Sequence, residues 1–335
     1  MALRWFRATA VTLLVLALIA AALWLPDMVV SARAAGLTAT EQLAAISTVR
    51  AQYIQIVSTA GGLVTVWYGI RKYFLDKEKQ RLDQDKHVTD RFSAAVGHLG
   101  SGDETVRAGG VRTLERIMAD SPRDHEAVVD TISGLLRHHA GSAPERSRLR
   151  DDVVAAVNAL RTRPDRAESD PLDLAGVVLP GVSLRRARLS GASLASAHLS
   201  RANLEQADLS QVRLLGTELG NARMAGSRLD GADLTGATAK EADLTGASAV
   251  GATFTRCVLS AANFTDADLT GANLSRARLR DASMTGTRLS GADLTDADLS
   301  GVDLRTAIGL TADSLRNAVT DSNTLLPDFT GSPPK

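Results

Sequence analysis

The sequence predicts a chain of three parts: a two-helix transmembrane hairpin, a small all-α domain, and an all-β solenoid built from a five-residue repeat. Three observations lead to this prediction. Two uncharged stretches lie near the amino terminus, amphipathic helical patterns follow, and a large apolar residue then recurs at every fifth position in the carboxy-terminal half. Aromatic residues make up only 4% of the 335 residues, so other side chains must build the core.

The two uncharged stretches are residues 8–26 and 51–70. Each approaches the roughly 20 apolar residues that cross a bilayer. Basic residues precede the first stretch and follow the second, whereas the loop 27–50 between them contains only two. By the positive-inside rule we expect residues 1–72 to form a hairpin in the plasma membrane. This topology makes the protein multi-pass, with both termini cytoplasmic and the lipid bilayer as a partner of both stretches.

Two features of this region complicate the prediction. The second stretch begins weakly apolar, because it contains Gln52 and Gln55. The run Ser31–Ala35 offers an Ala-x-Ala cleavage site, which would make the first stretch a secretory signal peptide. That stretch is longer than the roughly 7–15 apolar residues of such peptides, which favours an uncleaved anchor. Cleavage would leave the topology unchanged, since the second stretch would still anchor the chain.

We expect residues 73–163 to form a juxtamembrane helix and a small helical domain. The charged run 73–90 continues the second stretch into water. Ser121-Pro122 is typical of a helix start, with serine as the N-cap and proline in the first turn. Apolar residues at helical spacing predict helices over about 105–118, from Ser121 onward, and over about 146–160. Residues 164–171, polar with two prolines, form the predicted linker.

The five-residue period runs from Leu174 to Leu304, and every position in it is large and apolar except Ala239 and Ala249. A second column, mostly alanine, lies two residues before each of these positions. Five residues advance an α-helix by about 500°, and an odd spacing alternates between the faces of a strand. The pattern therefore predicts a chain that turns a corner every five residues and always points the same residue inward.

Segments such as Ala232–Gly236, Ala267–Gly271 and Ala292–Asp296 follow the pattern A-[DN]-L-x-x and resemble pentapeptide repeats. The resemblance covers residues 172–307. It implies that family's fold, a right-handed quadrilateral β-helix with four repeats per coil, here about seven coils and roughly 30 Å long. We expect residues 308–335 to supply a C-terminal cap, with a helix over 311–318, and a disordered tail.

Four repeats per coil would stack residues that lie twenty positions apart. One such column alternates charge, reading Arg188, Asp208, Arg228, Ser248, Asp268 and Arg288. Within the repeat, Leu234 and Leu269 should be buried, while the threonines that follow them should face outward. Upstream, the motifs Leu99-Gly100-Ser101 and Ala108-Gly109-Gly110 resemble a helical module, over roughly residues 87–140, that often precedes pentapeptide repeats in actinobacterial proteins. That resemblance implies no activity.

The sequence offers no catalytic, cofactor-binding or metal-ligating candidate. The single cysteine, Cys257, lies in the small inward column, which predicts a buried core thiol rather than a zinc ligand or nucleophile. Gly109-Gly110 fits no phosphate-loop motif, and no serine sits in a nucleophile elbow. Aspartates such as Asp233 and Asp268 occupy the polar slot of the repeat, where a structural role is expected. We therefore predict no enzyme activity and no cofactor.

The predicted function is a membrane-anchored, non-catalytic scaffold. It presents the β-helix of residues 172–307, here called the rod, to an unidentified protein partner on the cytoplasmic side. One alternative is a membrane sensor or signalling protein with the loop 27–50 as its input. Another is a DNA mimic that binds DNA gyrase, as some pentapeptide repeat proteins do. A mimic needs a strongly acidic rod, whereas residues 172–307 carry 15 acidic and 14 basic residues. The zero net charge of the chain argues against nucleic acid as a partner, and homo-oligomerisation stays open.

Overall fold

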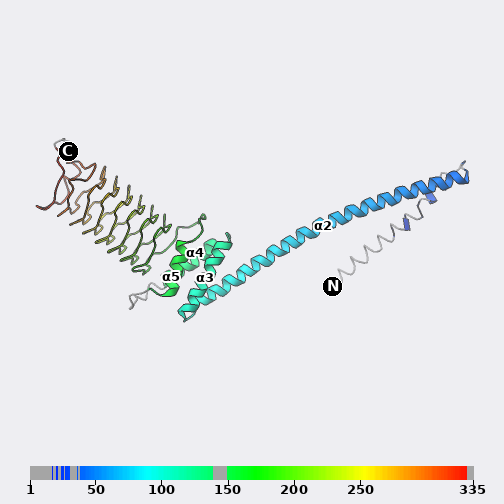
Figure 1. Cartoon of the computed structure of the whole chain (residues 1–335), viewed down its shortest axis with the longest axis horizontal. Helices are drawn as coiled ribbons and strands as arrows, with labels where there is room; N and C mark the ends of the chain where they lie inside the picture. The colour runs from blue at the N-terminus through cyan, green and yellow to red at the C-terminus, as the bar shows by residue number, and fades with distance from the viewer. Residues whose placement is uncertain are drawn as a thin grey trace. The chain divides into compact units, whose positions relative to one another are not determined.

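The computed structural model describes residues 17, 20–21, 24–25, 27–30, 36, 38–138 and 149–329. The chain divides into two compact units, Met1–His87 and Val88–Lys335. Figure 1 shows the helices α2 to α5 and, after them, the stacked coils of the carboxy-terminal half.

Helix α2 (Ala39–Leu99) begins in the first unit, and its last turns belong to the second. Its start is fixed by Thr38, whose backbone N–H and hydroxyl both donate to the Glu41 carboxylate, at 2.9 and 2.8 Å. The helix runs without interruption through residues 51–70 and the charged run that follows. The loop expected over residues 27–50 is therefore partly wrong, because residues 27–30 and 39–50 are helical.

The transmembrane hairpin is a wrong prediction. No helix in the described part of the chain combines the length and the hydropathy that membrane crossing requires. Residues 51–70 do form a helix, but Gln52 and Gln55, with further serine, threonine and glycine residues, lower its mean hydropathy. The finding also overturns the expected multi-pass placement in the plasma membrane with both termini cytoplasmic. Much of the first stretch, 8–26, lies outside the described residues.

Three shorter helices pack with the last turns of α2: α3 (Glu104–Asp120), α4 (His125–His138) and α5 (Asp151–Arg161). Asp103 caps α3, because its side chain accepts from the backbone N–H of Thr105 at 2.7 Å. Ser121, expected to begin the next helix, instead follows the end of α3 as its C-cap, and α4 begins at His125. Part of the helix expected over 146–160 lies outside the described residues.

From Asp173 onward the chain forms coils joined by parallel bridges between residues twenty positions apart, up to the bridge between Arg288 and Ile308. A period of five and a coil of twenty give four faces, so the solenoid expected from the repeat is confirmed. Each face contributes one bridged residue per coil, and the described residues contain no strand longer than this. The prediction of an all-β solenoid is wrong in that respect, because the described coils are joined by isolated bridges rather than by strands.

Backbone hydrogen bonding explains why a repeat of only five residues can form a stable structure. In the repeat Ala232–Gly236, all five N–H groups have acceptors within 2.7–3.0 Å. Three bind carbonyls of neighbouring coils, one closes the preceding turn, and one binds the Asp233 side chain. Buried N–H groups without partners are costly, so this complete pairing holds the coils together.

The core of the rod consists of the two inward columns. Leu234 and Leu269 are buried as expected, while Thr235 and Thr270 are partly exposed. The core continues without a break into the helical domain. Leu136 and Leu160, from α4 and α5, line a small void together with Leu174, Leu179 and neighbouring leucines of the first coil. Helices α4 and α5 therefore close the N-terminal end of the rod.

The opposite end differs from the expected cap. Residues 311–318 form turns rather than a helix, although Thr311 and Ser314 exchange the reciprocal hydrogen bonds of a helix start. Bridges from Asp298 to Val319 and from Asp303 to Leu325 show that the chain makes one more, irregular coil. The predicted disordered tail, residues 331–335, lies outside the described residues.

Candidate functional site

The outward surface of the rod has four faces, each defined by a column of bridged residues. Face 1 carries residues 173, 193, 213, 233, 253, 273 and 293, and face 2 carries 178, 198, 218, 238, 258, 278 and 298. Face 3 carries 183, 203, 223, 243, 263, 283 and 303, and face 4 carries 188, 208, 228, 248, 268, 288 and 308. Consecutive members of a column lie roughly 4.8 Å apart, so the faces present side chains at regular spacing.

Face 4 is the charge column that the sequence predicted, and its stacking is confirmed. Arg228 lies 4.0 Å from Asp208, and Arg288 lies 3.7 Å from Asp268. These side chains are substantially exposed, so each pair contributes at most about 1 kcal/mol. Arg188, at the start of the column, donates instead to the carbonyl of Arg163, the residue just before the linker. Opposite charges thus neutralise one another along this face.

Aspartate and asparagine in the bridged columns hold the turns of the rod. At each of these positions the side-chain oxygen accepts from the backbone N–H two residues ahead. Hydrogen bonds from the side chains of Thr270, Thr295 and Ser300 lower the pKa of Asp268, Asp293 and Asp298 below the ordinary value. The carboxylates expected to be structural therefore have a defined structural role.

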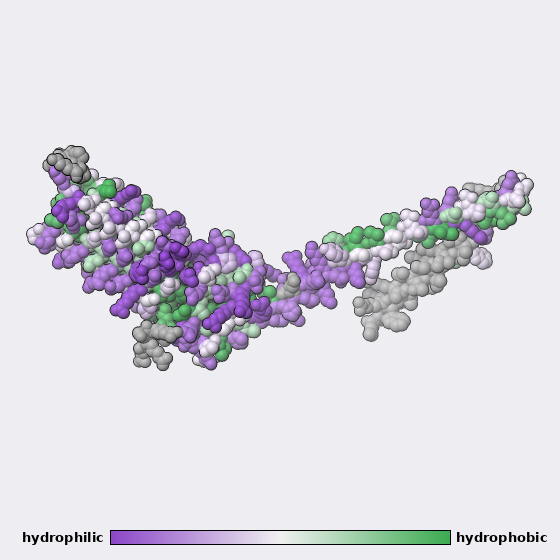
Figure 2. All heavy atoms as spheres, in the orientation of Figure 1, coloured by the Kyte–Doolittle hydropathy of each residue, from purple (hydrophilic) through white to green (hydrophobic). Residues whose placement is uncertain are grey.

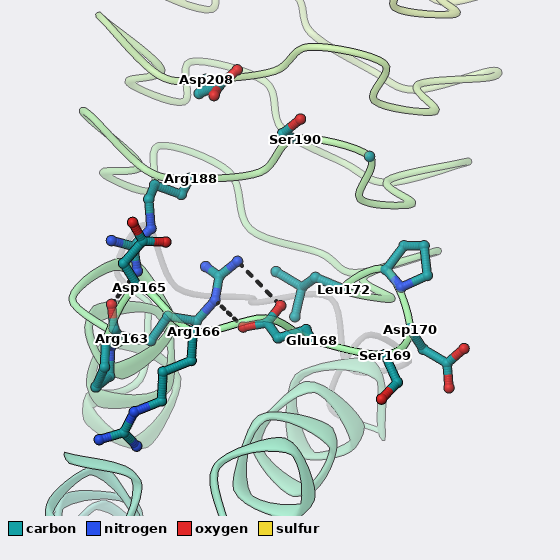
Figure 3. A pocket seen from close by; sticks show the side chains of 13 residues that line it. Arg163, Asp165, Arg166, Glu168, Ser169, Asp170, Leu172, Arg188, Ser190 and Asp208 are labelled. Atoms are coloured by element: carbon teal, nitrogen blue, oxygen red, sulfur yellow. Dashed lines mark hydrogen bonds and ion pairs between the residues drawn. The ribbon is translucent and has the colours of Figure 1, made fainter. Parts of the chain in front are cut away.

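A pocket of about 430 Å³ lies where the linker crosses the first coils. Residues 163–166 and 168–172, in and next to the linker, line it together with Arg188, Ser190 and Asp208 from face 4 and the corner beside it. Figure 3 shows these side chains around the opening. Arginines and carboxylates are mixed in its wall.

Much of the polar capacity of this pocket is used within the chain. Arg163 binds Glu168 at 2.7 Å and donates to the Leu160 carbonyl, as Figure 3 shows for the ion pair. Arg166 donates to the Met118 and Ala119 carbonyls at the end of α3. Burial opposes ionisation of Glu168, but the hydrogen bond and charge of Arg163 outweigh it, and the pKa of Glu168 is lowered. The polar contacts in the pocket wall therefore hold the linker against the helical domain.

A second buried ion pair ties the helices together. Asp152, at the start of α5, is fully buried and accepts from Arg107 of α3 at 2.5 Å and from Arg150 at 3.0 Å. Burial of Asp152 raises its pKa, but the two arginines outweigh that cost and the net shift is downward. Because removal of one partner leaves a buried charge unpaired, this cluster stabilises the packing of α3 against α5.

The cysteine and glycines singled out in the sequence have structural positions. Cys257 is fully buried in the inward column, as predicted, and burial raises the pKa of its thiol to about 12. A thiol with that pKa is protonated at neutral pH and is a poor nucleophile. At Gly110 a Cβ atom would lie 2.8 Å from the Ala95 carbonyl oxygen, so this glycine allows α3 to approach α2 closely.

The family comparison matches the rod. The family described as "Pentapeptide repeats (8 copies)" matches residues 173–206, 202–238, 240–276 and 272–308. Residues 173–308 of this chain therefore form a pentapeptide repeat region. The matched residues coincide with the coils that carry the twenty-residue bridges.

Solved pentapeptide repeat structures also resemble the chain. QnrB1, a plasmid-mediated fluoroquinolone resistance protein, is 22% identical, with 48% of this chain and 79% of that chain covered and a TM-score of 0.29. HetL, involved in heterocyst differentiation regulation in Nostoc sp. strain PCC 7120, is 28% identical, with coverages of 49% and 89% and a TM-score of 0.18. A thylakoid-lumen protein of Arabidopsis thaliana is 26% identical, with coverages of 30% and 72% and a TM-score of 0.19. No curated protein sequence matches the chain.

The pentapeptide repeat rod shows no clustering of the groups that perform chemistry. Within the described ranges, no three histidine, cysteine, aspartate or glutamate side chains are arranged to hold a metal ion. His198 pairs with Glu218 at 3.3 Å on face 2, and His125 pairs with Glu168 at 3.2 Å in the helical domain. The sequence did not reveal the linker pocket, because several of its contacts, those of Glu168 with His125 and of Arg166 with Met118 and Ala119, join residues that lie 43 to 48 positions apart.

Proposed function

We propose that this chain is a non-catalytic scaffold whose pentapeptide repeat rod binds a protein partner along one of its faces. The rod of this proposal comprises residues 172–307, preceded by the linker 164–171. The observation that carries the proposal is the unbroken ladder of bridges, which holds outward side chains in straight, regular columns. Such preorganised surfaces lose little conformational entropy on binding.

The structural roles of the aspartates and the cysteine in the rod support a scaffold rather than an enzyme. The aspartates of the repeat accept hydrogen bonds within their own turns, and the only thiol is buried. A catalytic acid or nucleophile instead needs a pKa near the working pH and access to substrate. Cys257 meets neither condition, because it is buried and its pKa is raised, and the pKa of Asp268 is lowered further from neutrality.

A DNA mimic that binds gyrase is the second candidate among pentapeptide repeat proteins, and the charges of this rod disfavour it. A mimic needs like charges in register, so that one strong negative field results. Face 4 instead alternates arginine and aspartate, with ion pairs at 4.0 and 3.7 Å. Purified full chain should therefore leave bacterial gyrase supercoiling unchanged at micromolar concentration, and inhibition would favour the mimic.

A scan of the four faces tests the scaffold proposal. One exposed arginine on each face is reversed in the full chain: Arg213→Glu, Arg278→Glu, Arg223→Glu and Arg288→Glu. Each variant captures partners from a lysate of the source cells, with the unmodified chain as reference. We expect one variant, or two on adjacent faces, to lose a partner that the others retain.

Thermal unfolding controls for damage to the rod. Because all four arginines are exposed, the variants should unfold within about 1 kcal/mol of the unmodified chain. Retention of every captured protein by all four variants, with unchanged stability, would show that the rod faces do not bind the partner.

A further inference from the structure

Helix α2 carries an apolar surface that nothing in the described residues covers. Figure 2 shows hydrophobic residues on the surface of this helix. Between residues 56 and 74 the exposed fractions are 64% for Ile56, 67% for Leu63, 58% for Trp67, 53% for Ile70 and 63% for Phe74. Contiguous exposed apolar surface on a protein commonly marks an interaction site.

The apolar residues follow a coiled-coil register. Large or small apolar side chains occur at spacings of four and three residues, at Ile56, Ala60, Leu63, Trp67, Ile70 and Phe74. This alternation, with a mean of 3.5 residues, defines a seam along one side of a helix. We call these six positions the α2 seam.

The opposite side of the same helix has a different composition. A stripe on the side opposite the seam is small or polar, and it comprises Gln55, Ser58, Gly62, Thr65, Gly69 and Lys72. Exposed apolar residues, Ile54, Tyr68 and Leu75, lie along one edge of this stripe. The apolar residues therefore favour one side of the helix, and the other side suits contact with water.

We propose that the α2 seam forms a coiled coil with the same seam of a second copy of this chain. Two observations identify the occupant as a second copy. No charged residue occurs between Arg50 and Arg71, so identical seams can meet without repulsion between like charges. The seam also repeats the register that homotypic helix pairs use.

The area available agrees with a stable pair. Burial of one apolar side chain removes roughly 60–120 Å² from water. The six seam side chains, with flanking Val64, Val66 and Tyr73, offer on the order of 800 Å² per helix, which matches the area that a typical stable interface buries on each partner. Upstream, Ile46 and Val49 continue the register but are half-buried, and Arg50 there pairs with Asp27 at 2.9 Å. The free seam therefore begins at Ile56.

Self-association through α2 would place two or more rods in one particle. A partner with repeated binding sites would then be held by several faces at once, which raises the overall affinity without any new contact. This consequence depends on the proposed function, whereas the self-association itself does not.

Light scattering of the purified full chain after size-exclusion chromatography tests the proposal. The test variant is the double substitution Leu63→Asp and Ile70→Asp, which places two carboxylates in the seam. The matched control is Ser58→Asp and Thr65→Asp, which places two carboxylates on the opposite side of the same helix. All four positions are exposed within the chain, so neither variant should unfold it.

We expect the unmodified chain and the control variant to have a mass of at least twice 35.3 kDa, and the seam variant to have the monomer mass. A monomeric unmodified chain, or equal masses for both variants, would overturn the proposal. Phosphatidylcholine vesicles provide a second arm. If a monomeric chain sediments with the vesicles and the seam variant does not, the occupant is a lipid surface and the second copy is excluded.

Discussion

At the scale of a single residue, an aspartate or asparagine in the polar slot of the repeat accepts hydrogen bonds from the residue two positions ahead. In the repeat that contains Asp243, its carboxylate accepts from the Thr245 N–H at 3.1 Å and from the Thr245 hydroxyl at 2.6 Å. The N–H would otherwise face outward from the turn without a protein acceptor. An amide oxygen can replace the carboxylate there, which explains why both aspartate and asparagine occur in this slot.

We therefore expect Asp243→Asn to preserve stability and Asp243→Ala to lower it by about 0.5–1.5 kcal/mol. The alanine variant removes the acceptor, whereas the asparagine variant keeps it and removes only the charge. Urea unfolding of the two variants measures the difference. Equal losses in both would show that the charge, rather than the turn hydrogen bond, is what matters at this position.

Side-chain direction in the repeat gives a second residue-scale prediction. Leu269 is fully buried, while the next residue, Thr270, is partly exposed. Leu269→Asp should lower stability by at least about 3 kcal/mol, because it buries an unpaired carboxylate. Thr270→Asp should stay within about 1 kcal/mol of the unmodified chain. Thermal unfolding of both variants checks this, and equal melting temperatures would contradict the inward assignment of the leucine column.

At the scale of the element, the rod should lose stability in acid. Hydrogen bonds from the side chain two residues ahead lower the pKa of Asp268, Asp293, Asp298 and Asp303. A carboxyl group with a lowered pKa stabilises the folded state above its unfolded value, near 3.9, and this contribution disappears as the pH falls through the folded value. The melting temperature should therefore decline below about pH 4.5.

Thermal unfolding between pH 2.5 and 6 measures this decline. Replacement of the four aspartates by asparagine removes the titrating groups and keeps the turn acceptors. The decline should be shallower in that variant. An unchanged slope would assign the acid sensitivity to carboxylates elsewhere in the chain, such as Glu168 and Asp152.

The elements also differ in how far the sequence predicts them. The rod is predictable because every coil repeats the same five-residue pattern of inward and turn positions. The large apolar column from Leu174 to Leu304 therefore indicates the fold directly. The hairpin prediction failed because absence of charge is not the same as high hydropathy, and glutamine, serine and glycine reduce the hydropathy of residues 51–70. The terminal helix failed because Thr311 and Ser314 provide a helix start, yet the chain continues to pair with the last coil.

The candidate site was less predictable than the fold. The columns of each face follow from the repeat, but the pocket beneath face 4 depends on Arg166 reaching the Met118 carbonyl and on Arg188 reaching the Arg163 carbonyl. These contacts join residues far apart in sequence and have no local pattern. The polar, proline-containing composition of residues 164–171 indicated a connection there, but not what that connection binds.

At the scale of the whole second unit, the helical domain and the rod share one hydrophobic core. The N-terminal coil has α4 and α5 against its open end, with Leu136 and Leu160 facing the first leucines of the rod. Among the described residues no helix covers the C-terminal coil, and Val319 and Leu325 are substantially exposed there. In repeat proteins, each unit is stabilised mainly by its neighbours, so a substitution that weakens a cap should lower the stability of the adjacent coil first.

Leu136→Ala should therefore weaken the first coil more than the distant ones. The substitution removes buried methyl groups at the junction, at a cost of about 2–5 kcal/mol. Amide hydrogen exchange should accelerate at Leu174 and Leu179 and change little at Leu294. The control, Leu279→Ala, removes the same groups from a coil far from α4 and α5 and should accelerate exchange in its own coil instead. Exchange that rises equally along the rod in both variants would mean that the coils unfold as one unit, and that α4 and α5 do not act as a local cap.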